Sequence, residues 1–296
     1  MNFIILIVLI SLSSITNAAS FDCHKANSTL EKSICNNLQF NELDEQMGNV
    51  YLSLRKMLGK DATTKLTQEQ RNWLKQRLQI CPSQDINCLM QVYQNHIGYL
   101  KTQQCANLQS AINLATKDKV IELEEITCHY KDSLQIQNKT NLTIVGEGDV
   151  WIIVDNIYTD VITIQDSQRI FLKNIKARHK KPLPNFNCEG AVINIINSNY
   201  IWLNHCELNG SGAVGVQVEK STNVIVNQCY IHHNTLAAFW LDNSNSIAIH
   251  DNTITENGST IYGLTAGDIR MNGNIIGNNQ GSFTWSSPFT REIMGE

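Results

Sequence analysis

Two acidic residues occupy matching places in a repeated sequence pattern. Glu219 ends the run GVQVE, and Asp242 lies 23 positions later in the run FWLDN. If copies of this pattern stack as neighbouring strands, the two carboxylates lie about 5 Å apart. At that separation, two acids can act as general acid and nucleophile on a glycosidic bond. Solvated acidic side chains on an ordinary sheet surface are the simpler interpretation of the same pattern.

Other side chains in these rows suit a sugar polymer. Aligning the runs gives one outward row and a second row beside it: Gln135, Thr163, Asn194, Gln217 and Trp240, then Gln137, Gln165, Ile196, Glu219 and Asp242. Amides hydrogen-bond to hydroxyl groups, and an indole ring offers a flat apolar face. Asn194, Gln217 and Trp240 are therefore candidate glycan-binding residues. Outward positions of any soluble sheet are also polar, so a plain surface is an equal alternative.

A basic stretch follows one of the repeats. The segment RHKKPLPNFNCEG, residues 178–190, is the longest expected loop between repeats and begins with Arg178 and His179. These two residues are candidates for holding an acidic polysaccharide, because a positive loop attracts anionic chains. Charge runs more commonly form a solvated loop.

The repeat itself predicts how these residues are positioned. Six aligned segments start at the following places: LTIVGEG at 142, IFLKNIKA at 170, IWLNHCEL at 201, VIVNQCYI at 224, IAIHDNTI at 247 and IRMNGNII at 269. Short alternating runs with this period and no helix signal predict a solenoid of stacked parallel strands. The sixth position of the last four segments holds Cys206, Cys229, Asn252 and Asn274, for which we predict an internal ladder. Parallel stacking disfavours disulfide geometry, so we expect Cys206 and Cys229 to be free thiols.

Residues 106–281 resemble the right-handed parallel β-helix superfamily that includes pectate lyases. The stretch CANLQSAINLATKDKVIELEE, which starts at Cys105, resembles the entry to that fold, an amphipathic helix that caps the open end. The resemblance implies that a glycan would lie along the first strand of each rung. The sequence lacks the Asp-rich and Gly-His-Asp motifs of polygalacturonases and the Arg and calcium-ligand set of pectate lyases. These differences favour binding over catalysis, with a polysaccharide lyase, glycoside hydrolase or epimerase as the alternative.

The first hundred residues have a different pattern. From 27 to 100 the apolar residues keep helical spacing, as in Leu89, Tyr93, Ile97 and Leu100. Capping boxes are expected at Ser28 with Glu31 and at Thr67 with Gln70. The overall fold class expected is therefore α + β, with a small helical domain before the parallel solenoid.

This helical part carries a spaced motif: CHKA at 23, EKSIC at 31, LD at 43, QRNWLKQR at 70 and CL at 88. The motif resembles the LprI-like family. The resemblance implies a four-helix exported domain and, through the founding member, a lysozyme inhibitor. His96 departs from the family, which usually has Arg there. Asp44, Arg71 and Arg77 are expected to form ion pairs between helices, with partner contact as the alternative, and Trp73 is expected in the core.

Nine cysteines suggest an oxidising compartment. Six of them form three locally spaced pairs, which we expect to be disulfides: Cys23 with Cys35, Cys81 with Cys88, and Cys105 with Cys128. Metal binding is the rival explanation, but no C-x-x-C or H-x-x-x-H spacing occurs. His205, His232, His233 and His250 occupy different repeat positions. We therefore expect no metal and no cofactor.

The first nineteen residues resemble a secretory signal peptide cleaved after Ala18 or Ala19, and their apolar run is too short to span a bilayer. A net charge of −4 does not suit a nucleic-acid binder. The expected organisation is a signal peptide at 1–19, an LprI-like helical domain at 20–101, a β-helix at 106–281 and a tail at 282–296. The protein is expected to be secreted or periplasmic, without a membrane span after cleavage. Its expected partners are a polysaccharide and lysozyme or another envelope protein.

Overall fold

The computed structural model describes residues 19–181, 190–262 and 265–280 of the chain. The described residues divide into two compact units, one made of those up to 49 and of 74–97 and the other of 50–73 and those from 98 onward. The division passes through three helices, each of which contributes residues to both units.

Four α-helices and a short 3₁₀-helix precede the strands: η1 (Cys23–Lys25), α1 (Thr29–Asn36), α2 (Leu38–Met57), α3 (Lys60–Ile80) and α4 (Ile86–Leu114). The capping box at Ser28 is confirmed, because its hydroxyl accepts from the Glu31 amide and the Glu31 carboxylate accepts from the Ser28 amide. The box expected at Thr67 is wrong. No breaker separates it from Lys60, so Thr67 lies inside α3 and its hydroxyl donates to the Thr63 carbonyl, 2.8 Å away.

The first unit packs around aromatic side chains. The rings of Phe40 and Tyr93 are both fully buried and meet edge to face, with centroids 5.0 Å apart. Two of the predicted disulfides, Cys23–Cys35 and Cys81–Cys88, form in this unit. Covalent closure of these short loops supports a core too small to be stable by burial alone.

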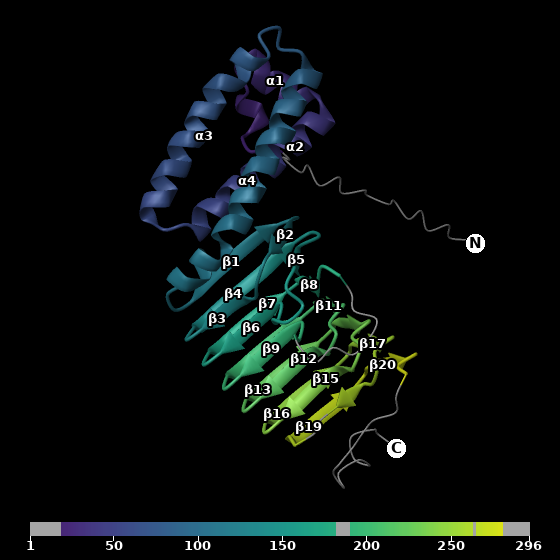
Figure 1. Cartoon of the computed structure of the whole chain (residues 1–296). Coiled ribbons are helices and arrows are strands. Elements are labelled where there is room, and N and C mark those ends of the chain that lie inside the picture. The colour runs from purple at the N-terminus through teal and green to yellow at the C-terminus, as the bar shows by residue number, and fades with distance from the viewer. Residues whose placement is uncertain (1–18, 182–189, 263–264, 281–296) are drawn as a thin grey trace, which may run out of the picture. The chain divides into compact units, whose positions relative to one another are not determined.

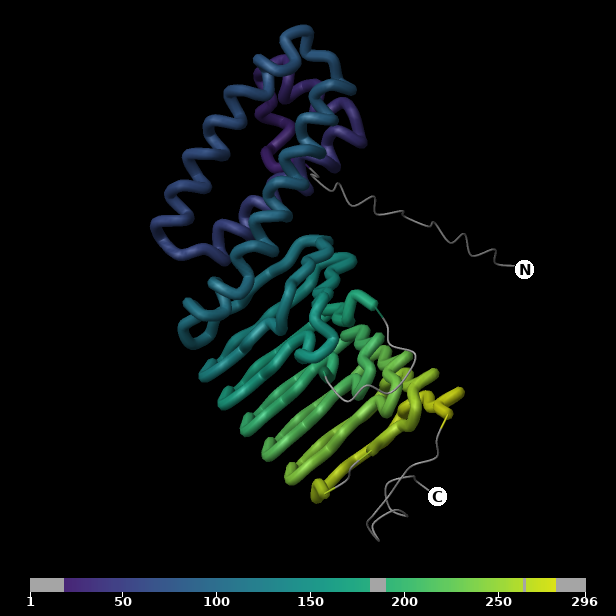
Figure 2. Tube along the Cα trace, in the orientation of Figure 1, coloured from purple at the N-terminus to yellow at the C-terminus, as the bar shows by residue number. Residues whose placement is uncertain are grey.

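Three parallel sheets form the predicted solenoid in the second unit (Figures 1 and 2). Sheet A contains β1 (Lys119–Glu124), β4 (Thr140–Glu147), β7 (Gln168–Lys173), β10 (Asn199–Asn204), β13 (Thr222–Asn227), β16 (Asn245–His250) and β19 (Gly267–Asn272). Sheet B contains β2 (Thr127–Tyr130), β5 (Trp151–Val154), β8 (Lys176–His179), β11 (Glu207–Asn209), β14 (Tyr230–His232), β17 (Thr253–Thr255) and β20 (Ile275–Gly277). Sheet C contains β3 (Leu134–Gln137), β6 (Ile162–Gln165), β9 (Ile193–Ile196), β12 (Val214–Glu219), β15 (Ala237–Asp242) and β18 (Ile261–Tyr262).

The predicted internal ladder at the turn between sheets A and B is confirmed. The Asn252 amide nitrogen donates to Asn274 Oδ1 at 2.9 Å, and Asn252 Oδ1 accepts from the Cys229 backbone. Cys206 and Cys229 are buried free thiols, as expected. The sequence pattern did not lead us to two further ladders, which satisfy buried backbone groups at the other turns: Ser167, Ser198, Ser221 and Ser244, and Asn234, Asn257 and Asn279.

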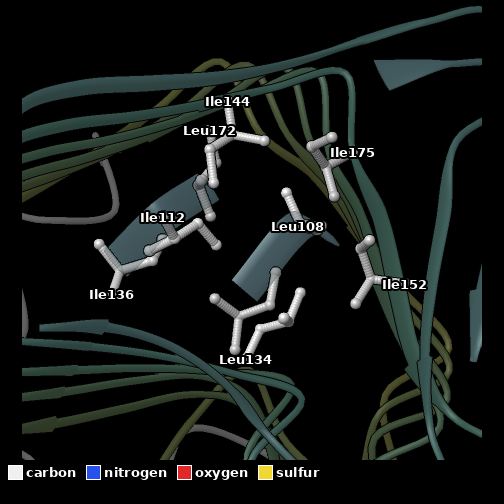
Figure 3. Close-up of a pocket in the computed structure, with 9 residues that line it drawn as sticks. Leu108, Ile112, Leu134, Ile136, Ile144, Ile152, Leu172 and Ile175 are labelled. Atoms are coloured by element: carbon white, nitrogen blue, oxygen red, sulfur yellow. The ribbon is translucent and has the colours of Figure 1, made fainter. Parts of the chain in front are cut away.

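The end of α4 closes the solenoid interior. Leu108 and Ile112 point into an apolar space lined by residues of the first rungs, among them Leu134, Ile136 and Ile152 (Figure 3). The third predicted disulfide, Cys105–Cys128, joins this helix to β2. α4 is continuous from Ile86 to Leu114, and so it runs through the segment 101–106 where the sequence suggested a change of domain.

Candidate functional site

Strand pairing in sheet C places the predicted outward residues in one row. Gln135 pairs with Thr163, Thr163 with Asn194, and Asn194 with Gln217. Trp240 follows Gln217, and Tyr262 extends the row by one rung. Because neighbouring strands lie about 4.8 Å apart, equivalent side chains repeat at that interval along the sheet.

Four residues of this row line an open pocket of about 550 Å³. Its lining is Gln135, Thr163, Asn194 and Gln217 from sheet C, with Asp132, Ser133, Tyr158, Thr159 and Asp160 from the connections beside it. The loop 155–161, between β5 and β6, supplies Tyr158, Thr159 and Asp160. Amides, hydroxyls and carboxylates converge here on one concave surface.

Asp160 joins this loop to two neighbouring rungs. Its Oδ2 accepts hydrogen bonds from Thr163 Oγ1 and Asn194 Nδ2, each at 3.0 Å. Its Oδ1 accepts from the backbone amide of Ala191, also at 3.0 Å. Three donors on one carboxylate fix the pocket floor. Sequence analysis missed Asp160, because it lies in a loop outside the repeat.

The Asn194 side chain is fixed by Asp160, and its amide oxygen is left without a hydrogen bond among the described residues. Only the NH₂ group can face the Asp160 carboxylate, since a carboxylate accepts and does not donate. Asn194 is 9% exposed, and its Oδ1 has no hydrogen-bond partner among the described residues. This acceptor is itself buried, so its unmet hydrogen bond is a local cost that the bonds to Asp160 offset.

His179 lies beneath the same loop and is fully buried. Its Nε2 lies 2.8 Å from the carbonyl oxygen of Thr159, so Nε2 carries the proton that is donated. Burial lowers the pKa of His179, which keeps the ring neutral. His179 therefore positions the pocket loop from below and does not face a ligand directly.

Arg178 lies away from the sheet C row. It belongs to β8 of sheet B, and its guanidinium lies over the Trp151 ring, 5.3 Å from the centroid. Arg178 and His179 were expected to begin a basic loop, but both are strand residues with alternating burial. Residues 182–189 of that expected loop, including Cys188, lie outside the described residues.

An aromatic pair occupies the other part of the row. The rings of Trp240 and Tyr262 meet edge to face with centroids 5.4 Å apart. Trp240 is half-buried, and its neighbours Phe239 and Leu241 are completely buried, as the alternation predicts. The face therefore has a polar pocket on its early rungs and aromatic rings on its later ones.

The two candidate catalytic acids are neighbours but belong outside the pocket. Glu219 and Asp242 pair across β12 and β15. Glu219 accepts a hydrogen bond from Gln217 Nε2, and Asp242 accepts one from Thr265 Oγ1. Neither is among the pocket residues, whose carboxylates are Asp132 and Asp160.

The lining of the pocket is acidic. Among the described residues that line it are two carboxylates and no Lys or Arg. Lys180, near the loop, lies 3.2 Å from Asp155 in an ion pair. Across the described ranges, no group of three or more His, Cys, Asp or Glu residues has the arrangement of a metal site.

Two family models match the chain. Residues 22–117 match "Lysozyme inhibitor LprI", and residues 150–290 match "Right handed beta helix region". Both matches agree with the resemblances found in the sequence. Comparison with curated proteins gives no match.

Three solved structures to which the chain is similar are as follows. A candidate glycosyl hydrolase from Parabacteroides merdae is 12% identical with a TM-score of 0.46, and the match covers 61% of this chain and 92% of that one. An alginate lyase from a Paenibacillus species is 13% identical with a TM-score of 0.43, and the match covers 58% of this chain and 74% of that one. The catalytic domain of a GH87 α-1,3-glucanase in complex with nigerose is 13% identical with a TM-score of 0.34, and the match covers 58% of this chain and 43% of that one.

Three disulfides favour an extracytoplasmic location, because such bonds rarely persist in the cytosol. Within the described residues, no helix has the length and apolar character needed to cross a membrane.

Proposed function

We propose that this protein, in which an LprI segment precedes a right-handed β-helix, is a secreted or periplasmic binding protein whose sheet C face holds a neutral polysaccharide. The observation that carries the proposal is the coincidence of the outward row with the pocket. Four row residues line one polar pocket, and the same row continues to Trp240 and Tyr262.

The geometry of the row suits a linear polymer. Gln217 presents a partly exposed amide beside the buried Asn194, and Trp240 follows on the next rung. A chain lying along the solenoid axis would therefore meet hydrogen-bonding groups first and an aromatic platform afterwards. A compact ligand could use the pocket or the aromatic pair, but would not span both.

Charge favours a neutral sugar over a uronic acid polymer. The pocket carboxylates Asp132 and Asp160 would repel an anionic chain, and no Lys or Arg offsets them in the part of the lining that the structure describes. Of the candidates for holding an acidic chain, Arg178 lies over Trp151 on sheet B, and His179 is buried beneath the pocket loop. Hydroxyl groups, by contrast, can donate to carboxylate and amide oxygens.

Binding is better supported than catalysis. Asp160 accepts three hydrogen bonds, which hold the pocket loop against the neighbouring strands. Glu219 and Asp242 lie outside the pocket and each accepts from a neighbouring side chain. An enzyme of the lyase, hydrolase or epimerase type remains the alternative function. It predicts product formation that depends on Glu219 or Asp242.

The helical segment supports a second binding role. Its match to the LprI family model suggests a lysozyme-like envelope protein as partner. The complete mature chain should then slow lysozyme turnover on peptidoglycan. Trp240→Ala is the matched control, since it alters only the glycan face. Unchanged turnover at high concentrations of the wild-type chain would remove this role.

The glycan proposal is tested by an array of neutral and acidic polysaccharides, with product analysis on the same samples. Retention of a neutral polymer without new reducing or unsaturated ends supports it. Retention of acidic polymers alone, or release of products, would favour a different ligand class or the enzymatic alternative.

A further inference from the structure

A buried carboxylate in the first unit lies next to the backbone nitrogen of Ser20. Asp44 of α2 is 2% exposed. Its Oδ2 accepts from the Ser20 amide nitrogen at 2.9 Å and from the Ser20 hydroxyl at 2.5 Å. The start of the described chain is therefore fixed on α2 by two bonds to one oxygen.

The ion pair expected for Asp44 does not form among the described residues, because its carboxylate is bonded to Ser20 instead. The ion pairs of the described residues include none between Asp44 and a Lys, Arg or His. Its remaining partner is the hydroxyl of Tyr93, which Arg77 contacts in turn. Buried charges in proteins are usually paired, because an unpaired charge away from water is costly. An amide and two hydroxyls solvate Asp44 without neutralising it.

The fit of Ser20 against α2 depends on a glycine. A Cβ at position 48 would lie 2.8 Å from the Ser20 Cβ. Gly48 lies four residues, or about one helical turn, after Asp44. The helix thus offers both room for Ser20 and an acceptor for its nitrogen.

We propose that Ser20 is the mature N-terminus, and that cleavage after Ala19 creates an α-ammonium group that forms an ion pair with the buried carboxylate of Asp44. In the cleavage, water hydrolyses the Ala19–Ser20 peptide bond; Ala19 leaves as a carboxylate, and the Ser20 nitrogen becomes an amine that takes up a proton. The nitrogen already lies at hydrogen-bonding distance from Asp44. Cleavage converts this hydrogen bond from a neutral amide donor into an ion pair. Removal of the leader therefore raises the free energy of unfolding of the first unit.

The groups around the Ser20 nitrogen predict a pH dependence. Asp44 faces it from α2, with Tyr93 of α4 and Arg77 of α3 behind the carboxylate, while Asp22 pairs with Lys25. A free α-amino group titrates near 8 in an unfolded chain. Pairing with Asp44 raises the folded pKa, so the stabilisation is complete below about pH 8 and is lost as the pH rises through the folded value.

The experiment starts with the intact mass and N-terminal sequence of the exported protein. The expected N-terminus is Ser20, and any other residue there overturns the proposal. Two complete chains, one starting at Ser20 and one starting at Ala19, are then unfolded in urea between pH 6 and 10. The chain that starts at Ser20 should have the higher midpoint at pH 6, and the difference should shrink as the pH rises.

Two variants separate the ion pair from general effects of the added residue. In Asp44→Asn, the two chain lengths should have equal midpoints, whereas the difference should survive in Glu45→Gln, which alters the exposed neighbour. If Asp44→Asn does not fold, the proposal is tested by whether the difference in urea midpoint between the two wild-type chains shrinks as the pH rises. Equal midpoints for the two wild-type chains, or a difference that does not change with pH, contradict the ion pair.

Discussion

The side-chain amide of Asn194 lies 3.0 Å from the carboxylate of Asp160, which ties a strand of sheet C to the loop beside it. The bond spans 34 residues of sequence. It fixes both the wall and the floor of the pocket, and it turns Asn194 Oδ1 away from Asp160. Pocket shape and strand stacking are therefore linked through one carboxylate.

Replacement of Asp160 should damage both the pocket and the fold. Asp160→Ala leaves the donors of Ala191, Thr163 and Asn194 without their acceptor, which we expect to cost about 1–3 kcal/mol of unfolding free energy. Glycan binding should fall with it. Urea denaturation and binding titrations provide the two measurements.

Asp132→Ala is the matched control, because Asp132 also lines the pocket but, within the described part of the chain, accepts a side-chain hydrogen bond from Asn156 alone. It should leave the unfolding free energy nearly unchanged. Equal losses of stability in the two variants would contradict the anchoring role of Asp160.

Phe239 should matter to stability far more than its neighbour Trp240. The Phe239 ring is completely buried, and Phe239→Ala should open a cavity that costs about 3–5 kcal/mol. Trp240 points outward and is only half-buried. Chemical denaturation of Phe239→Ala and Trp240→Ala measures both effects. A larger loss in Trp240→Ala than in Phe239→Ala would mean that the assignment of inward and outward residues is reversed.

The rows of sheet C could be predicted because the repeat fixes their register. A slip of one residue would expose the apolar set, so alternation alone identified the outward positions from Gln135 to Trp240. The internal cysteines followed from the same alignment. Repetition makes this kind of inference strong, since each rung confirms the next.

The pocket could not be predicted in the same way. Asp160 and Tyr158 lie in a connection between sheets B and C whose length changes from rung to rung, so no periodicity identifies them. His179 was misplaced because a run of basic letters, RHKK, conceals the alternation that makes its first two residues part of β8. The length of α4 was also missed, although no proline or glycine interrupts the sequence between Gly98 and Leu114.

Acid should destabilise the protein partly through His96. Burial lowers the pKa of His96 to about 4, below its ordinary value of 6.5. The unfolded chain then binds the proton more readily, so the contribution of His96 to stability is complete above pH 6.5 and falls as the pH drops from 6.5 towards 4. The difference in pKa sets an upper limit of about 3 kcal/mol, which partial solvation reduces to about 1–2 kcal/mol.

The measurement is the unfolding free energy of wild type and His96→Gln at intervals from pH 7 to pH 4. The variant should lose less stability over this range, because it lacks the titrating ring. His129→Gln, at an exposed position of β2, is the control and should follow the wild-type curve. Parallel curves for His96→Gln and wild type would remove this contribution.

Glu219 and Asp242 distinguish binding from catalysis. In Glu219→Gln and Asp242→Asn, the side-chain shapes are kept and the charges removed. We expect a modest change in glycan affinity, of about 1 kcal/mol or less, because both groups border the row without lining the pocket. Product analysis of the wild type should find no turnover. If products appear, and either variant abolishes them while binding persists, the protein is an enzyme.

The most direct test of the glycan-binding face compares two tryptophans on different sheets. Trp240 belongs to the sheet C row, whereas Trp202 is 40% exposed on sheet A, where its indole nitrogen donates to Asn227 at 2.5 Å. The measurement is the affinity of wild type, Trp240→Ala and Trp202→Ala for a neutral polysaccharide that the array identifies. Our account predicts a loss of about 2–4 kcal/mol in Trp240→Ala and none in Trp202→Ala. Full affinity in a folded Trp240→Ala, or a loss confined to Trp202→Ala, would contradict the placement of the glycan on sheet C.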